Sequence, residues 1–191
     1  MMASTAFLRN ERRHPMDLRQ KPRIGVMGPA LCLPEVYNLA REVGYLIGSK
    51  GAILICGGKG GVMEASAKGA QEAGGITIGI LPGASASEAN PYIDIPIVTD
   101  LGNARNAINV LTSQAIIAIH GSYGTLSEIA LALKCHTPVI GLDTWDLTPP
   151  GGATLPITNA RTAEEAVNTA LGMIPTEPIW IPSTGQLARH D

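Results

Sequence analysis

The chain of 191 residues is long enough for one domain and leaves little room for a second. Apolar residues make up 45% of it and charged residues only 16%, which predicts a buried core and excludes a disordered chain. Aromatic residues account for 4%, against 22 glycines and 14 prolines, so a layered α/β protein is favoured over an aromatic-rich β-sandwich. The net charge of −2 provides no field for holding a nucleic acid, although local anion sites remain open.

Cysteine usage and hydropathy point to a reducing, aqueous environment. Cys32, Cys56 and Cys135 show no C-x-x-C spacing, so neither a disulfide framework nor a protein-held metal is expected. The apolar run at residues 115–119 is far shorter than a membrane span. We therefore expect a soluble, cytoplasmic protein that contacts no membrane.

Residues 1–22 contain five basic side chains against two acidic ones, Glu11 and Asp17, and show no sustained apolar periodicity. A flexible basic tail is expected there, with a later start at Met16 or a targeting peptide as alternatives. Residues 23–172 are predicted to form a single Rossmann-like ligand-binding domain. Residues 173–191 would then be a C-terminal tail, with an apolar stretch at residues 179–181.

Within the domain, short apolar runs alternate with segments whose apolar residues recur every three or four positions. The runs predict strands at residues 24–27, 52–56, 77–81, 95–98, 115–119 and 138–142. The periodic segments predict helices at residues 35–49, 62–73, 104–111, 125–134 and 162–171. This alternation is typical of a parallel sheet covered on both faces, so the expected fold is a three-layer α/β sandwich of the Rossmann type.

Two further segments lack such periodicity. Residues 82–91 are rich in Ala, Ser, Gly and Pro, which predicts a mobile surface loop that could act as a lid. Residues 143–159 hold three prolines and two glycines and are expected to be irregular. A helix end with a left-handed glycine is expected at Gly74 and Gly75.

Two of the predicted strand-to-helix connections share one layout. Residues 56–64, C-G-G-K-G-G-V-M-E, align without a gap with residues 120–128, H-G-S-Y-G-T-L-S-E. Glycines there let the backbone turn sharply and bring amide groups towards a ligand at the positive end of the following helix. Ligands of such sheets bind beyond the carboxyl ends of the strands, so we expect two anion-binding loops at one edge. Tight turns that use glycine for geometry alone are the alternative.

Neither loop matches a standard nucleotide fingerprint. Lys59 is not followed by the Ser or Thr of a P-loop, and Met63 stands where a dinucleotide fingerprint needs its third glycine. The usual ATP and NAD sites are therefore not expected. The candidate ligand-binding residues are Gly28, Gly57, Gly58, Lys59, Gly60, Gly61, Arg105, Gly121, Ser122, Tyr123, Gly124, Thr125 and Glu128.

Several of these residues also have an interpretation that needs no ligand. Thr125 and Glu128 match a capping box with Thr125 as the N-cap. Arg105 and Lys59 lie at helix starts, where a positive charge is unfavourable without an anion. They could be solvated, or Arg105 could pair with Asp100.

His120, Trp145 and the pair Cys135 and His136 carry weaker hypotheses. His120 could act as a general base or be a structural histidine. Trp145 could stack on a ligand ring or pack against its own loop. Cys135 and His136 are isolated and form no metal-binding set.

Four segments resemble one family in sequence and order: residues 56–64, 74–82 (G-G-I-T-I-G-I-L-P), 104–106 (A-R-N) and 121–128. They are similar to the Lonely Guy-like (SLOG) superfamily and, within it, most like the branch of molybdenum cofactor carrier proteins. The resemblance covers about residues 23–171 and rests on several motifs with suitable spacing. Related sequences have been labelled lysine decarboxylases, but nothing in this chain indicates a pyridoxal-phosphate site.

Enzymes of the superfamily remove a base from a nucleoside 5′-monophosphate, with an arginine and the glutamate of a P-G-G-x-G-T-x-x-E motif. The resemblance places Arg105 and Glu128 at these two positions, as catalytic residues if the chain is an enzyme. His120 and Ser122 replace the proline and second glycine of the motif, and Asn106 replaces the usual lysine. The segment 128–138 is also shorter than in the cytokinin-activating enzymes. These departures favour the carrier branch.

The leading hypothesis is a non-catalytic protein that binds, protects and transfers a phosphorylated heterocycle, the molybdenum cofactor, under the loop at residues 82–91. The metal would arrive with the pterin, so no metal ligands are expected from the protein. The resemblance also implies a homodimer or homotetramer, with molybdoenzymes or cofactor-insertion proteins as candidate partners. A phosphoribohydrolase that releases free base and ribose 5-phosphate is the alternative.

Overall fold

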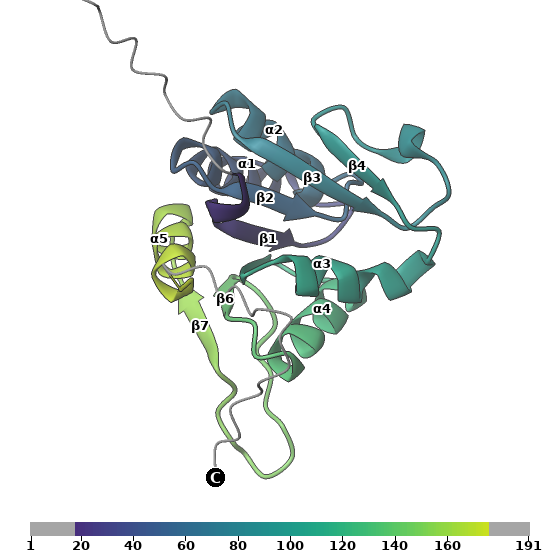
Figure 1. The fold of residues 1–191 in the computed structure, drawn as a ribbon. Helices are drawn as coiled ribbons and strands as arrows, with labels where there is room; N and C mark the ends of the chain where they lie inside the picture. The colour runs from purple at the N-terminus through teal and green to yellow at the C-terminus, as the bar shows by residue number, and fades with distance from the viewer. Residues whose placement is uncertain (1–17, 176–191) are drawn as a thin grey trace, which may run out of the picture.

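The computed structural model describes residues 18–175, and its centre is a seven-stranded sheet in which every neighbouring pair is parallel (Figure 1). The strand order is β4-β3-β2-β1-β5-β6-β7. The strands are β1 Arg23–Met27, β2 Ile53–Cys56, β3 Ile76–Leu81, β4 Ile95–Val98, β5 Ala115–Ile119, β6 Val139–Leu142 and β7 Ile157–Ala160. The expected Rossmann-like α/β fold is confirmed.

Helices cover both faces of this sheet. On one face α1 (Pro34–Ser49) packs against α2 (Val62–Glu72) and α5 (Ala163–Met173), and on the other α3 (Asn106–Thr112) packs against α4 (Tyr123–Lys134) (Figure 1). Three short 3-10 turns complete the elements: η1 Leu18–Gln20, η2 Ala86–Glu88 and η3 Gly102–Arg105. Within residues 18–175 no helix is long and apolar enough to cross a membrane.

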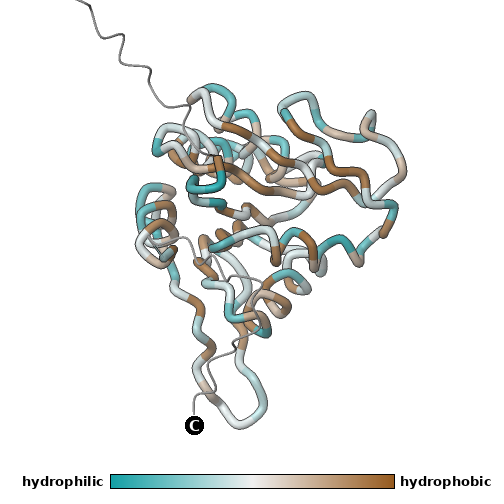
Figure 2. Tube along the Cα trace, viewed as in Figure 1, coloured by the Kyte–Doolittle hydropathy of each residue, from teal (hydrophilic) through white to brown (hydrophobic). Residues whose placement is uncertain are grey.

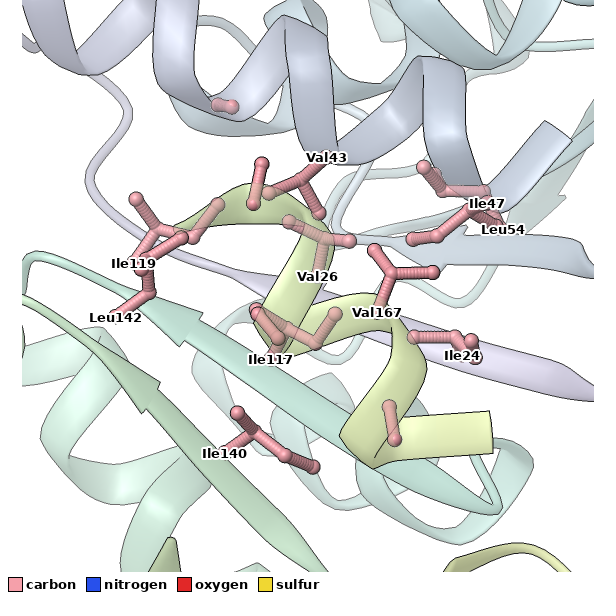
Figure 3. Packing of buried hydrophobic residues seen from close by; sticks show 14 of the residues in the cluster. Ile24, Val26, Val43, Ile47, Leu54, Ile117, Ile119, Ile140, Leu142 and Val167 are labelled. Carbon is pink, nitrogen blue, oxygen red and sulfur yellow. The ribbon is translucent and has the colours of Figure 1, made fainter. Parts of the chain in front are cut away.

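The central strands explain why the sheet folds around aliphatic residues. Ile24 and Val26 of β1 and Ile117 of β5 are fully buried, and Val43 of α1 and Val167 of α5 pack over them (Figure 3). Each such side chain contributes about 1.5–3 kcal/mol by leaving water. The hydropathy of the chain follows the same pattern, because the strands form its most hydrophobic part (Figure 2).

The strand order places a crevice at one end of the sheet. The chain runs outward from β1 to β4 on one side and from β5 to β7 on the other, so the order reverses between β1 and β5. In open α/β sheets, ligands bind outside the carboxyl ends of the strands at such a reversal. The connections that follow β1, β2 and β5 all meet there, and they include both glycine loops.

The stretch expected to be irregular contains the seventh strand. Ile157–Ala160 pairs with β6, with Val139 opposite Ile157 and Leu142 opposite Ala160. The sequence does not predict this strand, because it lies at the edge of the sheet and is exposed at Thr158 and Asn159, so it has no continuous apolar run. Pairing with β6 supplies the order that the local sequence does not predict.

Two helix starts also differ from the prediction. The segment expected as one helix from residue 104 begins as the 3-10 turn η3 and becomes α-helical only at Asn106. Helix α4 begins at Tyr123 with Ser122 as its N-cap, so Thr125 is the third helical residue. The capping box therefore joins Ser122 and Thr125, and the expected pairing of Thr125 with Glu128 is wrong.

Turn and loop geometry follows from local contacts. Gly74 has a φ of 71°, which is the left-handed conformation expected after α2. The loop at residues 82–91 is bound to the first glycine loop through Asn90. The backbone N–H of Asn90 donates to the Gly58 carbonyl at 2.9 Å, and its side-chain amide donates to the Lys59 carbonyl at 2.8 Å.

The predicted tails lie mostly outside the described residues. Of the N-terminal tail, residues 1–17 are outside, and Leu18–Gln20 form η1. Of the C-terminal tail, residues 176–191 are outside, including the apolar stretch at 179–181, whereas Met173 still belongs to α5. The domain limits remain a prediction.

Candidate functional site

A pocket of about 150 Å³ lies in the crevice where the strand order reverses. Its walls come from the end of β1, the first glycine loop, η3 with α3, and the first turns of α4. The predicted site residues that line it are Gly28, Gly57, Arg105, Ser122, Gly124, Thr125 and Glu128. The fold thus brings the residues of four separate sequence segments together.

Arg105 connects the two glycine loops across this pocket. Its Nη1 lies 3.5 Å from Oε1 of Glu128 on α4, and its guanidinium packs against Gly57, where an added Cβ would clash with it. The side chains are only 12% and 7% exposed. Arg105 therefore pairs with Glu128 and not with Asp100, and a glycine at position 57 is needed for this close approach.

Glu128 is held from a second side by α3. The Asn109 amide donates to the same Oε1 at 2.7 Å. Burial raises the pKa of the Glu128 carboxyl, while the Asn109 hydrogen bond and the Arg105 charge act in the opposite direction. The carboxyl is thus positioned by two donors in a weakly hydrated place.

Two buried polar atoms beside Glu128 lack a partner in the described part of the chain. They are Nε of Arg105 and Oδ1 of Asn109. Buried polar groups are almost always hydrogen-bonded, and an unsatisfied one costs about 1–3 kcal/mol. A donor and an acceptor therefore remain available next to the pocket.

The first turn of α4 is fixed by its own contacts. The Ser122 amide donates to Oγ1 of Thr125 at 3.3 Å. Ser127 donates to the Gly124 carbonyl at 2.7 Å and accepts from Asn106 of α3 at 2.8 Å. Among residues 18–175, no protein acceptor is recorded for the amides of Tyr123 and Gly124, which face the open end of the helix.

In the first glycine loop, more of the donors are used by the protein. The Val62 amide donates to the Pro29 carbonyl at 3.0 Å, and the Gly58 amide contacts Sγ of Cys56 at 3.4 Å. Nζ of Lys59 lies 3.1 Å from Glu88. Gly58, Lys59, Gly60 and Gly61 do not line the pocket. That this loop binds an anion stays a prediction.

His120 and Trp145 both contact neighbouring residues at the second glycine loop. Nε2 of His120 lies 3.0 Å from Asp143, and Nε1 of Trp145 donates to the Ser122 carbonyl at 3.3 Å. Trp145 therefore packs on the second glycine loop. Gly121 and Tyr123 lie outside the 150 Å³ pocket, on its Trp145 side.

The sequence did not indicate Asn103, which lines the pocket, Asn109, which donates to Glu128, or Asp143, which lies beside His120. The spacing of Asn106 and Asn109 on one predicted helix was a usable signal, because residues three apart share a face. Asp143 has no such signal, since only the pairing of β5 with β6 brings it beside His120. A larger hollow of about 550 Å³ under the loop between β6 and β7 contains none of the predicted site residues.

The sequence of residues 21–176 matches the family model of the SLOG cluster4 family. The chain belongs to this family. The match spans every strand and helix of the sheet described above, together with the pocket at the strand reversal.

Solved structures of similar proteins place this SLOG chain among cofactor-binding relatives. The molybdenum cofactor binding protein from the phototrophic bacterium Rippkaea orientalis is 41% identical, with a TM-score of 0.73 over 80% of this chain and 97% of that one. The molybdenum cofactor carrier protein from Chlamydomonas reinhardtii is 39% identical, with a TM-score of 0.70 over 80% and 98%.

A curated enzyme is also similar. The cytokinin riboside 5′-monophosphate phosphoribohydrolase of Mycobacterium tuberculosis is 35% identical over 120 residues. The aligned part is 58% of this SLOG chain and 64% of the enzyme, so the chain spans less than two thirds of that relative.

Proposed function

We propose that this chain is a cytoplasmic carrier that binds, protects and transfers a phosphorylated heterocycle, the molybdenum cofactor. Two structural neighbours at about 40% identity are named for binding or carrying this cofactor. Each is covered almost completely by the present chain, which supports a shared ligand class.

The observation that carries the proposal is the position of Arg105. It lies between two glycine loops at the strand reversal, and its buried Nε has no acceptor among the described residues. A phosphate oxygen in the pocket would supply that acceptor, and the guanidinium would supply the charge. The Gly124 amide would add a donor at the positive end of α4.

The size of the pocket limits what it can hold. Sites for whole drug-sized ligands usually measure about 300–1,000 Å³, whereas this pocket measures about 150 Å³. It would fit a phosphate group with the atoms next to it, and the rest of the ligand would extend outside. Gly58, Lys59, Gly60, Gly61, Gly121 and Tyr123 remain candidate contacts for that outer part.

The decisive test is retention of the cofactor. The purified chain is mixed without oxygen with molybdenum cofactor released from a molybdoenzyme, separated by gel filtration, and assayed for the oxidised, fluorescent pterin. We expect the wild type and Arg161→Gln, which changes an exposed arginine, to retain the pterin. Arg105→Gln should retain at least tenfold less. A wild-type chain that retains no pterin would overturn the proposal.

A phosphoribohydrolase is the second candidate, because Arg105 and Glu128 lie together as the enzyme hypothesis requires and an enzyme of this kind is 35% identical. Glu128 would stabilise the positive charge that develops on the ribose or orient the attacking water. A panel of nucleoside 5′-monophosphates tests this. The enzyme is established if the wild type releases free base and Glu128→Gln does not. Glu64→Gln, at the matching position of the first loop, should release base as the wild type does.

The assembly belongs to the proposal as well. We expect a homodimer or homotetramer, with molybdoenzymes or cofactor-insertion proteins as partners that receive the cargo. Sedimentation equilibrium of the purified chain measures the oligomeric state. A monomer at micromolar concentration would contradict it.

A further inference from the structure

A second hollow lies on the other side of the second glycine loop. It measures about 260 Å³, is wide open, and is lined by His120, Gly121, Asp143, Thr144 and Trp145. These residues follow the carboxyl ends of β5 and β6, at the same edge of the sheet as the Arg105 pocket. The function proposed above leaves this group of polar and aromatic side chains unused.

The polar half of the hollow is a contact between His120 and Asp143 that the backbone holds in place. Ile119 and Leu142 are partners in the register of β5 and β6, so His120 and Asp143 follow at matching positions. Both have a positive φ, 48° and 52°, which a non-glycine residue adopts at a cost of about 1 kcal/mol or more. Nε2 of His120 lies 3.0 Å from Oδ2 of Asp143, and the Thr144 hydroxyl donates to the His120 carbonyl.

The pair leaves Asp143 open to a ligand. Its side chain is 76% exposed, while that of His120 is 41% exposed. An ionised carboxylate only accepts hydrogen bonds, and its two oxygens can accept from two neighbouring N–H groups. The His120 contact involves Oδ2, so Oδ1 and the second lone pair of Oδ2 remain as acceptors on a residue that lines the hollow.

The aromatic half is Trp145, with Tyr123 beside it but outside the lining of the hollow. Trp145 packs directly on Gly121, where any Cβ would clash with its indole nitrogen, and its N–H is fixed by the Ser122 carbonyl at 3.3 Å. The Tyr123 ring stacks towards it, with centroids 6.4 Å apart and an interplanar angle of 29°. Tyr123 is 84% exposed although it is a large aromatic side chain. A flat ring can therefore stack here.

We propose that this hollow receives the heterocyclic ring of the carried ligand, with Asp143 accepting from adjacent N–H donors on the ring edge and Trp145 with Tyr123 stacking on its face. The aminopyrimidinone half of a pterin has such an edge. Ser122 lines the Arg105 pocket and accepts the Trp145 N–H, so one residue separates the two sites. A ligand with its phosphate at Arg105 would reach the hollow across it. This inference rests on the proposed carrier function.

The test compares binding of released molybdenum cofactor by four variants. A hydrogen bond to a charged group and a stacked ring each change affinity by about 5- to 150-fold. We therefore expect Asp143→Asn and Trp145→Ala to weaken retention at least fivefold. Trp145→Phe keeps a ring for stacking and should stay within about threefold of the wild type. Asp146→Asn removes an exposed carboxylate three residues away and should bind like the wild type.

A second measurement distinguishes ring contact from damage to the phosphate pocket. Inorganic phosphate should compete with the cofactor at the same concentration in the wild type and in Asp143→Asn, because phosphate alone does not reach Asp143. Thermal unfolding at an unchanged midpoint shows that the variants fold. If Asp143→Asn and Trp145→Ala bind as the wild type does, the ring site is wrong and the carrier function stands. If the wild type binds no cofactor, both fall.

Discussion

The two glycine loops align residue by residue in sequence, yet the fold uses them differently. In the loop after β2, Gly57 and Gly58 are buried, the Val62 amide is taken by Pro29, and Lys59 is paired with Glu88. In the loop after β5, residues 121–124 are exposed and two helix amides face outward without a protein acceptor among the described residues. The first loop supports the site, and the second forms its open wall.

The glutamates at the matching positions show the same difference. Glu64 of α2 is half-buried and accepts from the Tyr37 hydroxyl at 3.4 Å. Glu128 of α4 is buried against Arg105 and Asn109. A shared local motif thus predicts a shared turn, whereas the surrounding elements decide which copy reaches the ligand.

The largest expected effect concerns the two cations beside these loops, Arg105 of η3 and Lys59 of the first loop. Arg105→Ala leaves Glu128 buried without its charged partner, and such losses cost about 3–5 kcal/mol. Lys59→Ala removes a partly exposed ion pair, which contributes at most about 1 kcal/mol. Urea unfolding of both variants at neutral pH measures the difference. Equal losses would mean that the two loops carry equivalent charges after all.

The glycines offer the next comparison. Gly61 has a φ of 63°, and an added Cβ would clash with the Pro29 carbonyl, so Gly61→Ala should destabilise the fold by about 2–4 kcal/mol. Gly124 lies in the first turn of α4 with its nearest neighbour 3.7 Å away. Gly124→Ala should stabilise the fold by about 0.5 kcal/mol. Thermal unfolding tests both, and a destabilised Gly124→Ala would show that the second loop is as tightly packed as the first.

The glutamates should differ in their dependence on pH. Because burial raises the pKa of Glu128 in the folded state, the folded chain binds this proton more tightly than the unfolded chain. The free energy of unfolding should then fall as pH rises from the ordinary value of 4.5 through the raised pKa. The free energies of unfolding of the wild type and Glu128→Gln should therefore diverge over that range, and the variant should become the more stable of the two.

The control for this measurement is Glu64→Gln, which also removes one carboxylate. Urea titrations at several pH values from 4 upward compare the three proteins. A wild type whose stability relative to Glu128→Gln stays constant over this range would contradict a buried, proton-retaining Glu128.

The smallest effect concerns Cys56, the residue that opens the first loop. Burial raises the pKa of the Cys56 thiol to about 12, so almost no thiolate is present at pH 7.5. We expect iodoacetamide to label the exposed Cys135 within minutes and to reach Cys56 only after unfolding. Peptide mass spectrometry measures both sites. Rapid labelling of Cys56 in the folded chain would show that the first loop opens.

The sequence predicted most of the fold because its signals are local. Aliphatic runs and three-and-four spacing identify six of the seven strands and all five α-helices within a few residues. It missed β7, whose order comes from its partner strand, and it misplaced the N-cap of α4. Whether Ser122 or Thr125 is the N-cap depends on how sharply the chain turns after β5, and no local sequence pattern indicates this.

By itself, the sequence determined the parallel sheet, the glycine turns and the family, and it indicated Arg105 and Glu128 as candidate site residues. Those features follow from residue periodicity, backbone freedom and motif order, all of which are readable along one chain. Only the tertiary structure decided that Arg105 bridges the loops, that Asn109 holds Glu128, and that Asp143 meets His120. These contacts join residues 19 to 48 positions apart, and they exist because β1 lies beside β5, β5 lies beside β6, and α3 packs on α4.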